Sequence, residues 1–563
     1  MQWLLQRSVQ WVLGPVLVVT LATACATPSP APAPVSPNAP AAAEGPVQPK
    51  VQRVVFTLDP TTTETNNMNA IVAGDLVQLR PMYESLIGLD PTNSKLAPEL
   101  ATEWMLEPDG ASYRMKLRTG VQFHKGNGEF SSADLTPSYL QRKADEWPNG
   151  LAQYWRRTVS SIEVVGPLEA VYRLPKPDSN FLTSYASEQS ASMMIWSKKH
   201  FEAQGRPTMQ TQPLAGTAAY QFKERAQGQY IRFERVPYQH WRATPDFPEF
   251  EFRYVKEPST RLAALLAGEA HLASLPNDLL KQAEARSFKV ERGKVPGLRT
   301  FVSFWCCYFK DVNDGAKGYL YPDSPLMDVR VRRALSKAVD RDALNKAFYA
   351  GKGEPMIQSS HHPSRLGWNP DWEKRFADEY GYDPTKARQI LADAGYTADK
   401  PLTTTFVLAP AAGYAGAEDV AEAIVAQWRA VGVKVDLANI DASVRAANQR
   451  AWKFDNHSVI TGTGSDLFTG ISNFNTTLSP PGSGLHLPEM EPVIRQIERT
   501  VDTKALDELW RKAGDIAYSQ HQQIPLFWLP TEVAYNPTIV AGWAFPGGVT
   551  GSWTHVQNIK AAR

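Results

Sequence analysis

Hydrophobic and polar residues alternate along short runs in the first half of the chain, and a period of two is typical of β-strands with one buried face. Turn residues separate these runs: Asp109-Gly110, Gly166-Pro167 and Gln227-Gly228. Glycine favours such turns because it adopts positive φ without a steric cost. The strands that the pattern predicts are 52–58, 113–118, 121–124, 161–165, 170–174, 220–223 and 230–235.

From about residue 258 the hydrophobic period lengthens to that of amphipathic helices, with two further strands between or after them. Two earlier helices are expected as well, one of them beginning at Ser131 or Ser132, which are favourable capping residues. The predicted helices are 74–88, 132–140, 260–268, 329–350, 385–394, 417–431 and 488–520, and the strands are 433–437 and 524–529. This order predicts an α/β chain with a β-rich insertion near its start.

The composition bears on the class of macromolecular partner but does not identify a ligand. Of 563 residues, 43% are hydrophobic and 21% are charged, as in an ordinary globular protein. The formal net charge of +1 gives no reason to expect a nucleic acid as the partner. The 16 tryptophans fit either large interdomain cores or the aromatic walls of a binding cleft.

The N-terminus has the features of a secretion signal. Arg7 is the only charge before an apolar run over 11–24, which is too short for a confident membrane span. Residues 21–25, Leu-Ala-Thr-Ala-Cys, resemble a bacterial lipobox, although Ala22 stands where a large aliphatic residue is usual. We therefore expect a signal peptide over 1–24 and a lipidated Cys25, with cleavage by the ordinary signal peptidase as the alternative. Residues 25–50, rich in Pro and Ala, predict an extended tether to the membrane.

The other cysteines and the histidines do not form a metal-binding pattern. Cys306 and Cys307 are adjacent, and two buried thiols are expected there, with a vicinal disulfide as the alternative. His361 and His362 are adjacent as well, so their side chains point in different directions, and we expect no metal there or at His486 and His521. No cofactor is expected.

The catalytic motifs of several hydrolase and nucleotide-binding classes are missing. The sequence contains no GxSxG nucleophile elbow, no HExxH zinc motif and no glycine-rich phosphate loop. The sequence therefore favours a binding protein over an enzyme.

A series of sequence blocks stands in a recognisable order along the mature chain. The blocks are 83–90, 96–104, 109–124, 130–135, 216–222, 235–241, 328–341, 382–395 and 426–435. Together they resemble the family 5 solute-binding proteins of ABC importers, the oligopeptide, dipeptide and nickel group. The resemblance covers about residues 50 to 545.

The resemblance implies a two-lobed periplasmic binding protein of the α/β class (class II-like, cluster C), with a hinge and an extra β-rich domain. It places lobe I at 51–90, 212–300 and 525–563, inserted domain II at 91–211 and lobe II at 301–524. A ligand would lie between the lobes of a monomer and stabilise the closed form, which the ABC permease subunits would recognise. The expected location is the periplasm or the outer face of the plasma membrane, with Cys25 as the anchor.

In peptide-binding members of the family, an aspartate of lobe II pairs with the α-amino group of the ligand. Residues 460–474 match that region, and Asp466 is the candidate. Thr463 stands where the family has tryptophan, and the alternative reading of Asp466 is a turn residue in a Gly/Thr/Ser-rich loop. Trp305, Tyr308 and Tyr83 are further candidates for the ligand site, with core packing or a scaffold role as the alternative.

The sequence thus predicts a solute-binding lipoprotein that captures a solute, with a peptide as the first choice, and delivers it to a membrane permease. An oligosaccharide, an opine-like compound or a metal chelate is the alternative ligand for the same fold. A tethered solute sensor and a secreted hydrolase are the alternatives of another class.

Overall fold

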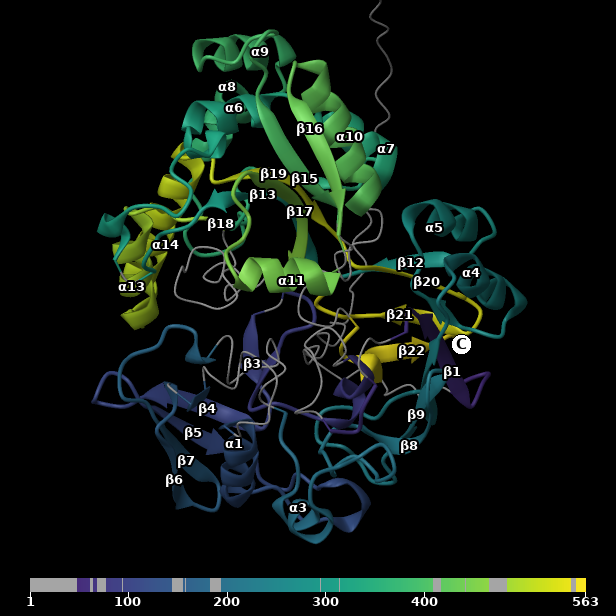
Figure 1. Cartoon of the computed structure of the whole chain (residues 1–563). Helices are drawn as coiled ribbons and strands as arrows, with labels where there is room; N and C mark the ends of the chain where they lie inside the picture. Colours follow the sequence, from purple (N-terminus) through teal and green to yellow (C-terminus); the bar gives the residue numbers. More distant parts are fainter. Residues whose placement is uncertain are drawn as a thin grey trace, which may run out of the picture. The chain divides into compact units, whose positions relative to one another are not determined.

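The computed structural model describes most of the chain after the tether, and Figure 1 shows its elements. The described residues belong to the second of two units, residues 47–563, into which the chain divides. They are 48–60, 64–67, 77–93, 95–143, 155–156, 158–182, 194–293, 295–312, 314–408, 417–440, 442–464, 484–547 and 553–563. Cys25 and Asp466 lie outside the described residues.

A seven-stranded mixed sheet, called here the first sheet, combines segments from the start, the middle and the end of the chain. β1 pairs in parallel with β10 and β11, and the other neighbours are antiparallel. Its order is β12 (Lys289–Arg292), β20 (Glu532–Tyr535), β11 (Leu272–Ala273), β1 (Arg53–Leu58), β10 (Glu249–Tyr254), β9 (Tyr230–Arg235) and β8 (Tyr220–Ala226). The predicted strands over 52–58, 220–223 and 230–235 are confirmed.

Aromatic side chains fill the core of the first sheet. Phe56 contacts Phe252 and, edge to face, Trp543, with ring centroids 5.7 and 5.9 Å apart. Trp543 belongs to a two-stranded ribbon of β21 (Val540–Trp543) and β22 (Ile559–Ala561). Helices α4 (Pro258–Ala267) and α5 (Asn277–Glu284) pack on β11, β12 and β20 (Figure 1). Helix α3 (Lys198–Gln204) is capped by Ser197.

A four-stranded antiparallel sheet follows an early hairpin of β2 (Ile87–Leu89) and β3 (Leu96–Pro98). Its order is β4 (Ala101–Leu106), β5 (Tyr113–Leu117), β7 (Glu169–Arg173) and β6 (Ser161–Gly166). Helix α1 (Leu135–Lys143) follows a 3-10 turn, η5 (Ser132–Asp134), whose N-cap is Ser131 as predicted. The strands expected over 113–118, 161–165 and 170–174 are also confirmed.

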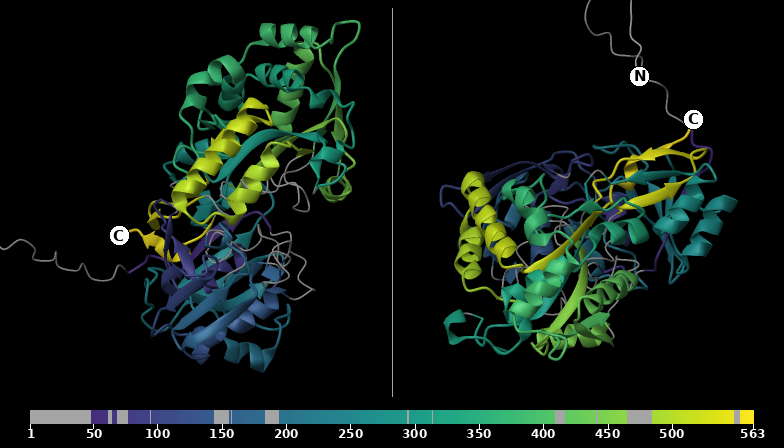
Figure 2. Two further views of the ribbon diagram at one scale, coloured as in Figure 1. Left: turned by 90° about the vertical axis from the view of Figure 1, so that its left-hand side faces the viewer. Right: turned by 90° about the horizontal axis from the view of Figure 1, so that it is seen from above.

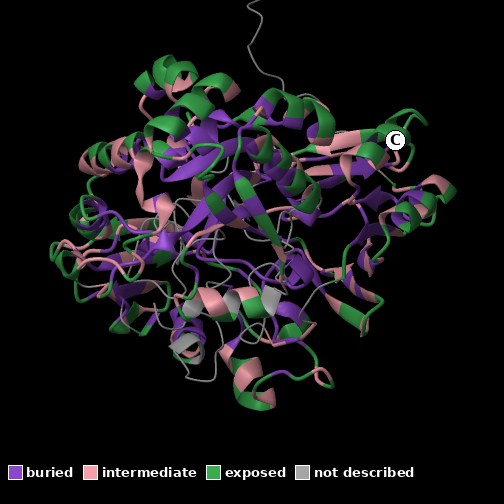
Figure 3. Ribbon diagram, turned by 45° about the horizontal axis from the view of Figure 1, so that its top comes forward, coloured by how far each residue is buried: buried purple, intermediate pink, exposed green. Residues whose placement is uncertain are grey.

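The second large sheet carries most of the helices. Its order is β14 (Glu354–Pro355), β19 (Gln523–Leu529), β13 (Leu298–Cys307), β17 (His457–Gly464), β15 (Thr403–Leu408) and β16 (Lys434–Asn439), with β18 (Gly484–Leu485) beside β13. The helices are α6 (Val329–Lys337), α7 (Arg341–Tyr349), α8 (Asp371–Tyr380), α9 (Pro384–Asp393), α10 (Ala417–Ala430), α11 (Ala442–Arg450), α13 (Met490–Arg499) and α14 (Thr503–Ser519). Figure 3 shows the buried strands beneath helices whose outer faces are exposed.

Two of the predicted helices are interrupted. The run 329–350 forms α6 and α7, and Asp340 caps α7 by accepting a hydrogen bond from the Ala343 amide at 2.9 Å. The run 488–520 forms α13 and α14, and Asp502 caps α14 by accepting one from the Ala505 amide at 2.8 Å. Both aspartates are N-cap residues inside an otherwise helical pattern.

Two predictions in the first half are wrong. The described part of 74–88 includes a 3-10 turn, η3 (Arg80–Met82), and the start of β2, because the backbone becomes extended at Tyr83. The run 121–124 is not a strand; it leads into the 3-10 turn η4 (His124–Gly126). Gln122 makes only an isolated bridge with Glu129.

The second sheet connects to the first through two crossing segments. The Gly293 amide donates to the Thr531 carbonyl at 2.9 Å, and the Gly297 amide donates to the Leu529 carbonyl at 3.0 Å. These bonds join the segment between β12 and β13 to the end of β19 and to the segment between β19 and β20. Within the described ranges, no helix is both long and apolar enough to cross a lipid bilayer.

Candidate functional site

The predicted site residues Trp305 and Tyr308 lie at the end of the central strand β13 and directly after it. Trp305 is 4% exposed, and its ring lies 4.8 Å from that of Phe454. Tyr308 is fully buried, with its ring 4.8 Å from Trp452 and 5.5 Å from His486. The two candidates belong to one aromatic cluster, together with Phe454, Val407 of β15 and Val459 of β17.

Polar atoms inside this cluster lack hydrogen-bond partners. Nδ1 of His486 accepts a hydrogen bond from the Phe309 amide at 3.0 Å, whereas its Nε2 has no partner among the described residues. The Tyr308 hydroxyl likewise has none. Burial lowers the pKa of His486 to about 3 and raises the pKa of Tyr308 well above its usual range. The histidine is therefore neutral at physiological pH.

A hollow of about 460 Å³ opens beside the aromatic cluster. Phe309, Leu320 and Trp452 give it an apolar wall, and Lys310 and Lys317 give it positive charge. Lys317 is paired with Asp311 at 2.7 Å. Sequence reasoning missed Trp452, because nothing in the local pattern joins it to residues 305–308 some 150 positions earlier.

Tyr83, the third candidate among the described residues, lies in the first-sheet half of the molecule. Its hydroxyl donates a hydrogen bond to the Leu214 carbonyl at 2.8 Å, and only 6% of its surface is exposed. Burial raises its pKa well above the usual range. The structure thus brings Trp305 and Tyr308 together but places Tyr83 in a separate core.

Next to Tyr83 lies a buried charge network that the sequence did not reveal. Arg242 bridges the carboxylates of Glu84, at 3.3 Å, and Glu99. The Trp241 indole donates to Glu84 at 3.1 Å, and the Ser85 amide donates to Glu99 at 3.1 Å. Burial alone would raise the pKa of Glu84, but Arg242 and the hydrogen bonds from His240 and Trp241 bring it below its usual value.

The space at this network is small. The cavity that the network lines measures about 30 Å³, which is room for about one water molecule. The carboxylates of Glu84 and Glu99 face Arg242, and Arg80 lines the same cavity. The two negative charges are thus balanced by two positive ones, and a charged ligand is not needed to neutralise them. We therefore interpret the network as support for the 83–85 segment.

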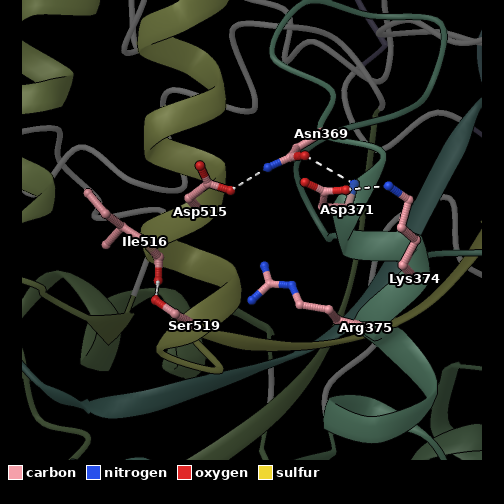
Figure 4. Close-up of a pocket in the computed structure, with 7 residues that line it drawn as sticks. All are labelled: Asn369, Asp371, Lys374, Arg375, Asp515, Ile516 and Ser519. Atoms are coloured by element: carbon pink, nitrogen blue, oxygen red, sulfur yellow. Dashed lines mark hydrogen bonds and ion pairs between the residues drawn. The ribbon is translucent and has the colours of Figure 1, made fainter.

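A larger hollow of about 610 Å³ lies between α8 and α14 (Figure 4). Its two cations pair with carboxylates, whereas Asp515 is held by neutral hydrogen-bond donors. Lys374 contacts Asp371 at 2.6 Å, Arg375 contacts Glu379 at 3.2 Å, and Asp515 accepts a hydrogen bond from Asn369 at 2.9 Å. The cations of the hollow are thus engaged by the protein, and the Asp515 carboxylate is engaged by the Asn369 amide and, at 2.8 Å, by the Trp372 indole.

The adjacent histidines singled out in the sequence have structural partners. Nδ1 of His361 contacts Gln358 at 3.0 Å, and its Nε2 contacts the Trp510 carbonyl at 2.9 Å. His362 contacts Ser364 and Glu354. Among the residues that the structure describes, no group of three His, Cys, Asp or Glu side chains could hold a metal ion.

The expectation of two buried thiols on β13 is wrong, because the structure joins Cys306 and Cys307 in a disulfide. Adjacent residues of a regular strand point to opposite faces, which favoured separate thiols. The pairing of β13 with β18 shifts register between Trp305 and Cys307, so the strand is irregular at this point. Both cysteines are fully buried.

Comparison with known proteins gives a consistent result. A family model described as "Bacterial extracellular solute-binding proteins, family 5 Middle" matches residues 95–484. The chain is 25% identical to the dipeptide-binding protein of Escherichia coli (strain K12) over 485 residues, which cover 81% of this chain and 85% of that protein. It is 27% identical to heme-binding protein A of Haemophilus influenzae over 380 residues, which cover 63% and 64%.

The solved structure of NikA from Brucella suis in complex with Fe(III)-EDTA superposes with a TM-score of 0.73 at 20% identity. The superposition covers 90% of this chain and 99% of that one. The fold is therefore that of the two-lobed periplasmic binding proteins with mixed α/β content, as the sequence predicted.

Proposed function

Because the chain belongs to the bacterial extracellular solute-binding proteins of family 5, we propose that it captures a solute outside the cytoplasm and delivers it to an ABC importer. The single observation that carries this proposal is the family match over 95–484, which spans both β13 and the four-stranded sheet. We propose the inserted domain over 91–211 and the lobes with the boundaries expected from the sequence, except that 298–300 and 525–529 belong to lobe II, because β13 and β19 are strands of the second sheet. The protein then acts as a receptor and not as an enzyme.

A peptide is the ligand that we propose first. The dipeptide-binding relative aligns over 81% of this chain, whereas the heme-binding relative aligns over 63%. In this proposal, Asp466 pairs with the ligand's α-amino group, since a carboxylate facing an ammonium in a closed cleft fixes the register of a peptide. Trp305, Tyr308 and Tyr83 would contribute by shaping the walls behind the ligand, which agrees with their burial.

We test the ligand class by mass spectrometry of small molecules released from the purified protein, paired with melting curves against peptide and oligosaccharide panels. A ligand of the native state raises the melting temperature by mass action. Asp466→Asn should weaken peptide binding at least tenfold, because removing one partner of an enclosed charge pair costs about 2 kcal/mol or more. Asp436→Asn, on the exposed side of β16, is the matched control and should bind normally.

Other outcomes separate the alternatives. Stabilisation by oligosaccharides, opine-like compounds or metal chelates, without a response to peptides, would retire the peptide and the role of Asp466 while leaving the receptor function. Co-purification with a signalling partner in place of permease subunits would favour a tethered sensor. Turnover of a bound compound would favour a hydrolase.

The proposed tether is a lipid on Cys25, which would hold a monomer at the periplasmic or outer face of the membrane. Cells labelled with a fatty-acid analogue should yield a labelled protein, and Cys25→Ser should release it from the membrane fraction. An unlabelled mature chain that begins at or near residue 25 would instead indicate the ordinary signal peptidase.

A further inference from the structure

Residues 178–181, which follow β7, are anchored on the four-stranded sheet. This loop forms a turn, in which the Phe181 amide donates to the Asp178 carbonyl at 3.3 Å and the Asn180 amide donates to the Asp178 carboxylate at 2.8 Å. The buried Phe181 ring stacks on Tyr113 with centroids 5.1 Å apart. This leaves Ser179 at the second position of the turn, on a fixed support.

The loop meets the C-terminal end of α13, which belongs to the second sheet. The last carbonyls of a helix have no partner within it and need donors from elsewhere. Thr500 donates hydrogen bonds to two of these carbonyls. Its hydroxyl donates to the Gln496 carbonyl at 2.7 Å, and its amide donates to the Ile497 carbonyl at 3.2 Å. The third, the Glu498 carbonyl, accepts the Ser179 amide at 3.2 Å.

Helix α13 is likewise anchored, by packing against a hydrophobic core. Val493, Ile494 and Ile497 are buried in the core of the second sheet, and α13 packs beside α14 (Figure 2). A contact between two rigid parts responds to any rotation of one part against the other, because neither side can follow by bending.

The segments that cross between the two sheets lie away from the contact between Ser179 and Glu498. They run through Gly293 and Gly297 on one chain segment and through Thr531 on the other. In Figure 1, α13 stands above the four-stranded sheet, whereas β12 and β20 stand on the far side of α11. Opening about the crossing segments therefore moves Ser179 and Glu498 apart by more than it moves residues close to the crossing.

We propose that the hydrogen bond from the Ser179 amide to the Glu498 carbonyl is a catch that holds the protein closed, so that the inserted four-stranded domain regulates closure. The inference rests on the proposed function as a two-lobed receptor. The catch forms only when the inserted domain and α13 meet, and it adds its free energy to that of the ligand contacts. One net hydrogen bond corresponds to about a fivefold change in the ratio of closed to open molecules.

A proline at position 179 removes this donor and little else. Proline lacks the backbone N–H, and it is favoured at the second position of a β-turn, where its fixed φ suits the fold. Ser179→Ala is the matched control, because it keeps the amide and removes only a hydroxyl that has no partner among the described residues. A comparison of these two variants isolates the catch.

The measurement is the distance distribution between spin labels at the exposed positions Val164 and Tyr382, introduced as cysteines in the whole protein without ligand. The expected result is a fall of about fivefold in the closed-to-open ratio for Ser179→Pro relative to Ser179→Ala. Equal ratios in the two variants would overturn the proposal. Because no ligand is added, failure of the peptide assignment leaves this outcome unaffected.

Hydrogen exchange gives a second test that needs no proline. In the Ser179→Ala protein, the amide of residue 179 should exchange several-fold more slowly than the exposed amides of the same loop, and more slowly still when a stabilising ligand is present. Exchange at the rate of an exposed turn, with no response to ligand, would show that the amide is not held and would overturn the catch.

Discussion

Buried neutral histidines occur in each half of the molecule. Burial lowers the pKa of His124 and His361 to about 4, and that of His486 and His521 to about 3. An unfolded histidine has a pKa near 6.5. Protons therefore bind the unfolded chain more tightly than the folded one, and acid favours unfolding.

We predict that His486→Asn reduces the acid sensitivity of the fold. The folded pKa of His486 is lowered, so the stability that its neutral form contributes is fully present above about pH 6.5 and is lost as the pH falls toward 3. The asparagine side chain can accept the hydrogen bond from the Phe309 amide but does not titrate. Urea unfolding between pH 4 and 7 should show a shallower dependence of the unfolding free energy on pH, by up to one proton.

The decisive quantity in this experiment is the slope of the unfolding free energy against pH, and not the unfolding free energy at pH 7. A packing change would shift the unfolding free energy equally at every pH. If the variant and the unchanged protein lose stability in parallel between pH 6.5 and 4, then His486 binds protons in the folded state and its burial does not govern the acid response.

Among individual residues, sequence reasoning found part of the aromatic cluster. Trp305 and Tyr308 stood out because two aromatic residues flank the cysteine pair. Trp452 and His486 complete the cluster from distant positions, and the alternation pattern carries no information about which strands become neighbours. The cysteine pair itself was wrongly expected to be reduced, since an irregularity of β13 is a property of its pairing with β18.

Among the elements, the crossing between the two sheets depends on glycine. A Cβ on Gly297 would lie far inside contact distance of the Thr531 hydroxyl and close to the Gly547 carbonyl. We predict that Gly297→Ala forces the crossing segments apart and costs about 1–3 kcal/mol of unfolding free energy, as overpacking does elsewhere. Denaturant titration followed by tryptophan fluorescence measures the loss.

Gly166→Ala is the control for that substitution. Gly166 ends β6, has no positive φ, and has nothing within 4 Å of an added Cβ. Its replacement should change the unfolding free energy by no more than about 0.5 kcal/mol. Equal effects at the two glycines would mean that close approach at the crossing does not limit the fold.

The elements themselves were predicted well wherever a local signal existed. Most strands with clean alternation appeared in place, as did α9 and α10, whereas 121–124 did not. The breaks before α7 and α14 were missed, although Asp340 and Asp502 carry an N-cap signal of their own. The prediction for 74–88 failed because its apolar residues fit a helical period by chance, while the extended backbone at Tyr83 and the pairing of β2 with β3 determine its conformation.

For the molecule as a whole, the four-stranded sheet must stay attached to the first sheet if its catch on α13 is to act on closure. The network of Glu84, Glu99 and Arg242 provides this attachment. Glu99 lies between β3 and β4, and Arg242 lies in the loop after β9, so that their ion pair joins the two sheets. Trp241 packs against the core of the four-stranded sheet from the same loop.

We predict that Arg242→Met destabilises the protein by about 3 kcal/mol, because two buried carboxylates lose their shared cation. The double variant Arg242→Met with Glu99→Gln should recover part of the loss, since one of the uncompensated charges is gone. Arg173→Met, which removes surface pairs with Glu163, Glu107 and Asp109, should cost no more than about 1 kcal/mol. Calorimetry checks these values, and a separate early transition in Arg242→Met alone would show the inserted domain unfolding on its own.

If Arg242→Met lowers the unfolding free energy no more than Arg173→Met does, then packing, and not this charge network, holds the two sheets together.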